Sequence, residues 1–220
     1  MMITKAANFG NPHVGLFAKA NDSTAFVDIS ASPKLLSALP ALGVEIKQTA
    51  FGGSGLIGIY LAMNNIGAVV PSFCSKAEIS VLKASGLSVA VLPGQFCAAG
   101  NNVAANDFGA VANPEMPRRL LRELSDCLGV EVVPKSIAGF STVGSCLIAT
   151  NKGFAVHNRA SEKEITELSK IFKVGGLNCT LDMGVAFVSL GAAANSKGAV
   201  IGEATSGFEA GRLSEALGLF

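Results

Sequence analysis

The sequence predicts an α/β fold in which five copies of a strand–strand–helix–strand unit close into a propeller-like ring. Three observations lead to this prediction: five similar segments along the chain, a helix-start signal after these segments, and the total length. Equivalent positions recur every 42 to 45 residues, a period typical of repeat architectures. Five such units take up almost all of the 220 residues, so we expect one domain over residues 1–220.

Each unit is expected to open with a β-hairpin. A small residue, an apolar run, a polar turn and a second apolar run follow one another in every copy, with hairpin starts near residues 15, 58, 100, 144 and 189. An Asn stands two or three residues before the turn position in all five copies: Asn21, Asn64, Asn106, Asn151 and Asn195. Asn and Gly tolerate positive φ, so this pattern is typical of tight hairpin turns.

A helix is expected after each hairpin. Ser75 and Glu78 have the spacing of a capping box, as do Ser161 and Glu164, and Ser32-Pro33 suits a helix start. Further helices are predicted over residues 117–128 and from about 205 to 217. Four helices are followed by a glycine suited to a left-handed C-cap: Gly43, Gly86, Gly129 and Gly218.

The third strand of each unit follows its helix and explains how the ring closes. Short apolar strands are expected at residues 44–48, 87–92, 130–133 and 177–181. The first five residues resemble such a strand without a preceding helix, whereas the last helix has no strand after it. We therefore expect residues 1–13 to complete the fifth repeat, with helices outside and strands around the axis. Closure removes the exposed edges that an open array would have.

Composition and charge exclude several classes of protein. Charged residues are only 15% and the formal net charge is +1, which gives no global field for nucleic acid or an anionic surface. No apolar stretch is long enough for a membrane span. Five scattered cysteines and two histidines match neither a disulfide framework nor a zinc site. We expect a cytoplasmic protein with reduced thiols and no metal or cofactor.

One end of the predicted ring is poor in charge. An irregular segment precedes each hairpin, and symmetry places all five segments at the same end. Each segment contributes one phenylalanine to this end, and almost no charge accompanies them: Phe9, Phe51, Phe96, Phe140 and Phe187. Two interpretations stay open: the rings pack between units as core, or some are exposed and form a protein-binding face.

Four segments of the sequence resemble translation initiation factor 6, and the likeness extends repeat by repeat over the whole chain: Gly10–Lys19, Gly100–Asp107, Val143–Gly153 and Ala193–Gly198. That family has a five-fold pentein fold, which agrees with the predicted ring. The resemblance implies a monomeric anti-association factor without enzymatic activity. It would bind the large (50S) ribosomal subunit on its intersubunit face and block joining of the small subunit, next to ribosomal protein uL14, an L24-type protein and the sarcin–ricin loop of 23S rRNA.

The resemblance also implies which residues contact the ribosome: Asn101, Phe187, Ile59, Cys146, His13, Gly100 and Ser145. At two of these positions the sequence departs from the family, because Ile59 stands where an Arg is familiar and Cys146 where a Tyr is familiar. Eukaryotic members have a phosphorylated tail beyond the fifth repeat. The sequence stops at Phe220, so we expect an archaeal-type member.

An enzyme of the same fold is the alternative. Guanidine-modifying penteins need a cysteine nucleophile, a histidine and carboxylates that converge on the ring axis. Cys146 or Cys179 with His13 or His157 is the best set that the sequence offers. The glycine-rich segment 51–55 fits neither a P-loop nor a dinucleotide fingerprint, and a strand rather than a helix follows it.

Overall fold

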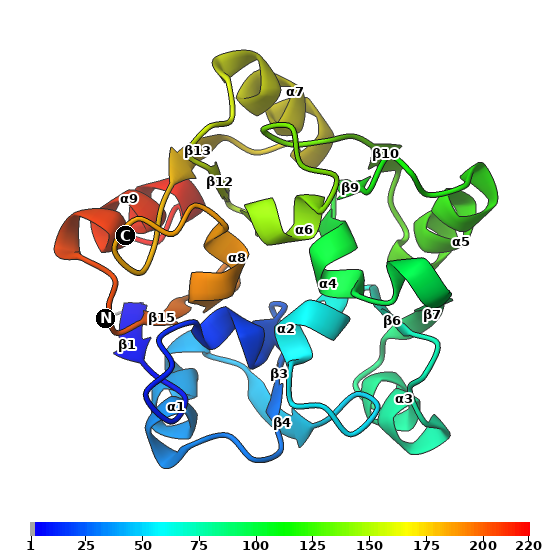
Figure 1. The fold of residues 1–220 in the computed structure, drawn as a ribbon, viewed down its shortest axis with the longest axis horizontal. Helices are drawn as coiled ribbons and strands as arrows, with labels where there is room; N and C mark the ends of the chain where they lie inside the picture. Colours follow the sequence, from blue (N-terminus) through cyan, green and yellow to red (C-terminus); the bar gives the residue numbers. More distant parts are fainter. Residues whose placement is uncertain (1–2) are drawn as a thin grey trace.

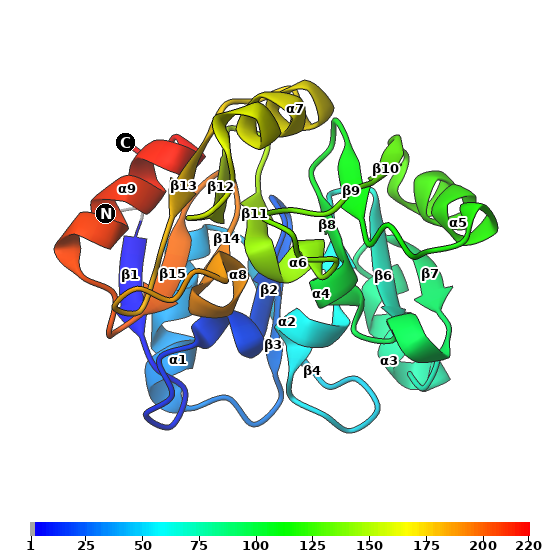
Figure 2. The ribbon, with the colours of Figure 1, turned by 45° about the horizontal axis from the view of Figure 1, so that its top comes forward.

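Five three-stranded sheets stand around a common axis in the computed structural model, which describes residues 3–220 (Figure 1). In each sheet the first two strands are antiparallel and the third runs parallel to the second. A helical connection leads to the third strand in four sheets, whereas the fifth sheet takes its third strand from the N-terminal segment. The longer helices lie at the rim, whereas the strands and several short helical turns lie closer to the axis (Figure 2). The predicted arrangement of five strand–strand–helix–strand units is therefore confirmed.

The strands of the five sheets, in unit order, are β2 (Ala18–Ala20), β3 (Thr24–Asp28) and β4 (Glu45–Thr49); β5 (Ala62–Met63), β6 (Gly67–Pro71) and β7 (Ser88–Leu92); β8 (Val103–Ala105), β9 (Ala110–Ala112) and β10 (Val132–Pro134); β11 (Leu147–Ala149), β12 (Phe154–His157) and β13 (Gly176–Cys179); β14 (Ala192–Ala194), β15 (Ala199–Gly202) and β1 (Ile3–Ala6). The rim helices are α1 (Pro33–Ala38) with η2 (Leu39–Leu42), α3 (Lys76–Lys83), α5 (Arg118–Leu128), α7 (Glu162–Phe172) and α9 (Gly207–Leu217).

Most ends of the rim helices lie where local sequence signals place them, but the C-cap of α3 is Ala84 and not the predicted Gly86. Ser75 and Ser161 each accept a hydrogen bond from the backbone of the Glu three residues later, and both capping boxes are complete. Gly129 ends α5 with a φ of 67°, in the left-handed region where glycine avoids the steric cost of a Cβ. A third capping box at Ser206 starts α9.

One helical turn precedes the first strand of every unit, where the sequence predicted the hairpin to start. These turns are η1 (Val14–Leu16), α2 (Ile57–Tyr60), α4 (Ala99–Asn102), α6 (Val143–Cys146) and α8 (Val188–Gly191), with η3 (Gly94–Phe96) shortly before α4. Residues 15, 58, 100, 144 and 189 lie inside them, and the first strands begin three or four residues later. The expected hairpin starts are therefore wrong by about one turn.

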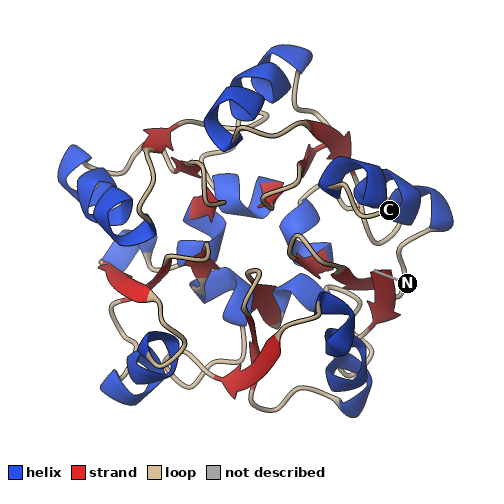
Figure 3. Ribbon diagram, turned by 180° about the vertical axis from the view of Figure 1, so that it is seen from behind, coloured by secondary structure: helices blue, strands red, loops and turns tan. Residues whose placement is uncertain are grey.

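The polar turns of the five hairpins lie at the opposite end of the ring (Figure 3). Asn64 is representative: its Oδ1 accepts from the amides of Ile66 and Gly67 at 3.0 and 2.9 Å, and its Nδ2 donates to the carbonyl of Asn106 in the next unit at 3.1 Å. Asn21, Asn106 and Asn195 repeat this pattern. The side chain therefore closes the turn and joins neighbouring units.

Two expectations about these turns are wrong. Thr150, not Asn151, has the equivalent position in the fourth unit and closes its turn through Oγ1. The glycines of the turns do not have positive φ. Gly67 is needed because a Cβ there would lie 2.2 Å from the carbonyl oxygen of Cys127, so a close approach of the neighbouring helix end, and not backbone conformation, selects glycine.

A second polar ring follows one residue further along each turn. Each backbone amide donates to the side-chain oxygen of the next member at 2.7–3.2 Å, and the circuit is closed: Asp22, Asn65, Asp107, Asn151 and Ser196. The side-chain amides of Asn65 and Asn151 each also donate to the carboxylates of Asp22 and Asp107. This circuit ties all five units together at the axis.

The first and last units share one sheet. Strand β1 pairs in parallel with β15, with Ile3 opposite Ala199, and the amide of Glu203 donates to the carbonyl of Ala6 at 2.8 Å. Residues 3–6 thus form the third strand of the fifth sheet, whereas Met1 and Met2, which the prediction also included, lie outside the described residues. Figure 1 shows the N-terminal strand beside the last helix.

The core lies between the units, where the helix of one unit covers the sheet of the preceding one. Leu120 and Leu124 of α5 pack with Val69 and Leu92 from β6 and β7. Each fully buried side chain of this size contributes about 1.5–3 kcal/mol, so the units stabilise one another. Within residues 3–220, no helix combines the length and apolar character needed to cross a bilayer.

Candidate functional site

The five helical turns surround the axis at one end of the ring, which we call the turn face (Figure 1). Their sequences are Val-Gly-Leu, Ile-Gly-Ile-Tyr, Ala-Gly-Asn-Asn, Val-Gly-Ser-Cys and Val-Ser-Leu-Gly, so none contains a charged residue. Interface cores are depleted in charge in the same way. The turn face is therefore suited to a protein partner more than to a phosphate backbone.

Small residues let the turns touch backbone to backbone. A Cβ added to Gly58 would lie 1.7 Å from the carbonyl oxygen of Gly15, and one added to Gly100 would lie 2.0 Å from that of Gly58. Ser189 continues the contact by donating to the carbonyl of Ser145 at 3.2 Å. Gly100 and Ser145, both expected at the ribosome, are thus buried at contacts between turns and fix the shape of the face.

Asn101 and Asn102 are adjacent on α4 but have different surroundings. Asn102 is buried, donates to the carbonyl of Ala98 at 3.0 Å and accepts from Asn113 at 2.8 Å. Asn101 is partly exposed, and its amide group makes no hydrogen bond within residues 3–220. The side chain of Asn101 therefore keeps its donors and acceptor available for a partner.

Ile59 and Cys146 also differ in the exposure of their side chains. Ile59 is partly exposed, whereas the side chain of Cys146 is fully buried. Burial raises the pKa of the Cys146 thiol to about 11. The expectation that Cys146 offers a side-chain contact to a partner does not agree with this burial, because Cys is shorter than the Tyr familiar at this position and ends inside the core.

The cysteines and histidines do not form catalytic pairs. Burial, more than the neighbouring Glu209, raises the pKa of the Cys179 thiol to about 11, whereas a nucleophilic thiol needs a lowered pKa. Nδ1 of His157 accepts the amide of Arg159 at 3.1 Å, and His13 contacts Asp182. Within the described chain neither histidine forms a hydrogen bond with a thiol.

Phe187 belongs to an aromatic triad between the fourth and fifth units. Its ring centroid lies 5.0 Å from that of Phe140 and 5.2 Å from that of His157. His157 is buried, and burial, with a smaller contribution from Arg159, lowers its pKa. Phe187 and Phe140 are half-buried, so they combine a structural role with a partly accessible surface.

The other three phenylalanines before the turns have different environments. Phe51 and Phe96 are buried, in agreement with the interpretation as core, whereas Phe9 is 76% exposed at the tip of a tight loop. The interpretation as core therefore holds for Phe51 and Phe96. Phe9 is exposed, and a protein-binding role for the exposed rings stays a prediction.

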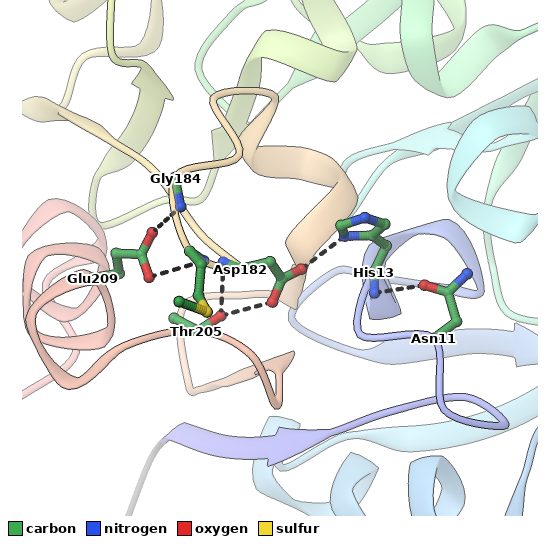
Figure 4. A network of polar contacts seen from close by, with 7 residues as sticks. Asn11, His13, Asp182, Gly184, Thr205 and Glu209 are labelled. Carbon is green, nitrogen blue, oxygen red and sulfur yellow. Dashed lines mark hydrogen bonds and ion pairs between the residues drawn. The ribbon is translucent and has the colours of Figure 1, made fainter.

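His13 lies in a polar network that links the first unit to the fifth (Figure 4). Its Nδ1 is 2.9 Å from Oδ2 of Asp182, whose other oxygen accepts from Thr205 at 3.0 Å. Glu209, buried at the start of α9, accepts from the amide of Gly184 at 2.8 Å. The sequence interpretation missed Asp182, Thr205 and Glu209, although Ser206 and Glu209 have capping-box spacing.

Comparison with known proteins agrees with this arrangement. A sequence profile of the eIF-6 family matches residues 3–216. The chain belongs to the eIF-6 family. Translation initiation factor 6 of Methanoculleus marisnigri is 39% identical over 211 residues, which cover 95% of both chains. The proteins of the same name from Methanosphaerula palustris and Staphylothermus marinus are 35% and 33% identical, and each alignment covers 99% of this chain and 98% of the relative.

Family membership confirms the resemblance drawn from the four motifs. The eIF-6 relatives are initiation factors of protein biosynthesis. The family therefore assigns the chain to translation.

Proposed function

We propose that this protein binds the large (50S) ribosomal subunit through the turn face and thereby prevents its association with the small subunit. The observation that carries the proposal is the free amide of Asn101 on an uncharged face. Family membership supports the partner, and we take the ring to be the family's pentein fold, acting as one domain. A rigid ring on the joining surface acts by occupying space, so no reaction and no cofactor are needed.

The chemistry of the turn face favours contact with ribosomal proteins. The turns contain no Lys or Arg, so they have no cation to neutralise phosphate charges. We infer that uL14, flanked by an L24-type protein, lies against Asn101, Ile59 and Phe187. The sarcin–ricin loop would lie beside this contact rather than at its centre.

Asn101→Ser provides the test, with co-sedimentation of the purified protein and large subunits as the measurement. Losing an interface hydrogen bond should weaken docking about tenfold, and the melting temperature should stay near that of the wild type because no internal partner is lost. Phe187→Asp should weaken docking further by placing a charge in the interface. Lys163→Glu on the outer helix α7 should change neither property.

Asn102→Ser is the matched control. This neighbouring amide is buried and bonded within the ring, so its loss should cost about 1–3 kcal/mol of stability. Folded Asn102→Ser should still bind the subunit. If Asn101→Ser unfolds the protein and leaves binding per folded molecule unchanged, Asn101 is structural and the turn face loses its support as the docking surface.

A further inference from the structure

The outermost strand of each sheet has one edge without a neighbouring strand. Such an edge presents free N–H and C=O groups and readily pairs with another chain, so natural proteins usually protect it. In this ring the edge strands are β1, β4, β7, β10 and β13. They differ sharply in protection.

Four of the five edges carry a protecting feature. Lys5 is on β1, and its amine bonds to the carbonyl of Thr205. Strand β4 carries an ion pair between Lys47 and Glu45 at 3.3 Å. Pro134 stands at an outward position of β10 and has no N–H to offer. In β13 the carbonyl of Asn178 accepts from Nε of Arg212 at 3.2 Å.

Strand β7 has no such feature. Its sequence is Ser-Val-Ala-Val-Leu, without charge or proline. The amide of Ser88 donates to the carbonyl of Ile66 just before β6, and the carbonyl of Leu92 accepts from the amide of Ser72 just after it. The alternate residues, Val89 and Val91, therefore direct their backbone groups outward. Within residues 3–220, no hydrogen bond reaches these groups.

A groove of about 550 Å³ begins where β7 ends. One wall is formed by Val91 and by residues 93–96, including Phe96, and the other by Pro117 and Leu120 at the start of α5. Val91 is 42% exposed in it. Arg119 and Glu123 at the lip bond to each other at 2.9 Å, so the groove does not select for a charge.

We propose that β7 is a strand-addition site, where an extended apolar segment of another protein pairs with Val89 and Val91 and places a side chain in the groove. Free backbone groups recognise an extended chain in particular, and a groove beside them selects one side chain. Strand β7 and α5 lie at the rim, away from the turns around the axis (Figure 1). The strand that would be extended is therefore distinct from α4, which carries Asn101 of the proposed ribosome contact.

The test is selection from a random peptide library displayed on phage against the immobilised full-length protein. Peptides with apolar residues at every second position should be enriched, and their affinity is then measured by fluorescence anisotropy. Val91→Pro removes an outward N–H that the fold does not use and should weaken binding about tenfold. Gln48→Pro makes the same change on the protected edge of β4 and should leave binding unchanged.

N-methylation of the selected peptide keeps the test independent of how the variants fold. Methyl groups on the amides that face β7 should abolish binding, whereas methyl groups on the alternate amides should not. Equal binding by both methylated peptides would overturn the proposal. So would a selection in which the wild-type protein enriches no peptides relative to the Val91→Pro variant. So would a concentration-dependent dimer in sedimentation that Val91→Lys dissolves, because the occupant would then be a second copy.

Discussion

Replacing Lys19 by Met is expected to stabilise the ring at neutral pH. Lys19 lines the axial channel among apolar side chains that include Val103 and Leu147. The channel has room for about 20 Å³, close to one water molecule. No hydrogen bond to its amine is formed within the described residues. Burial lowers the pKa of this amine to about 8.

The size of the effect follows from that pKa. It falls from 10.5 to about 8 on folding, and each pKa unit corresponds to about 1.36 kcal/mol, so keeping the amine charged costs at most about 3 kcal/mol. Lys19 is only partly buried by accessible surface, and residual water reduces the penalty. Met fills a similar volume without a charge, so we expect a gain of about 1–3 kcal/mol.

Urea unfolding at several pH values measures this gain. The unfolded lysine holds its proton up to about pH 10.5, whereas the folded one releases it near 8, so the wild type gains stability as pH rises through this window. The advantage of Lys19→Met should be full below pH 8 and fade toward pH 10.5. Lys163→Met on exposed α7 is the control and should show no such trend. A destabilised Lys19→Met, or a gain independent of pH, would refute the reasoning.

Three further predictions concern the fold. Deleting residues 1–6 should lower the single melting transition of the whole ring, because the fifth sheet loses β1; an unchanged melting temperature would contradict closure. Gly58→Ala should cost about 1–3 kcal/mol in urea unfolding, since the added Cβ would meet the carbonyl of Gly15. Wild-type stability should fall as pH drops below about 6.5, because the unfolded state protonates His157 before the folded state does. Between pH 7 and pH 5, the melting temperature of His157→Gln should fall by less than that of the wild type.

Much of the fold could be predicted because its signals are local or repeated. Ser75 and Ser161 specify helix starts through their own side chains, and a recurring period identifies the units without any knowledge of contacts. The helical turns could not be predicted, since one turn is too short to show a helical period. The sequence predicts strand starts at Gly58 and Gly100, because a glycine does not reveal whether it serves backbone conformation or a close approach.

The candidate site was predictable only in outline. Asn101 and Asn102 are the same residue type at adjacent positions, and only the direction of each side chain on α4 makes one free and the other structural. Cys146 was expected at the surface because the residue familiar there is longer. The network around His13 joins residues 169 positions apart, a contact that no local pattern contains.

The pairing of β1 with β15 also sets the order in which the ring can be assembled. The segment synthesised first can pair only after the last unit has been synthesised, since Ile3 is opposite Ala199. Closing a loop of that length in a flexible chain would cost about 5 kcal/mol of entropy. Once the four earlier units have formed and docked on one another, they already hold the two ends near each other. The loss of chain entropy is then divided among the docking steps, and little of it remains for closure. We therefore expect closure to be the final event of folding, and a nascent chain to expose the edge of β15 until its own N-terminus pairs with it.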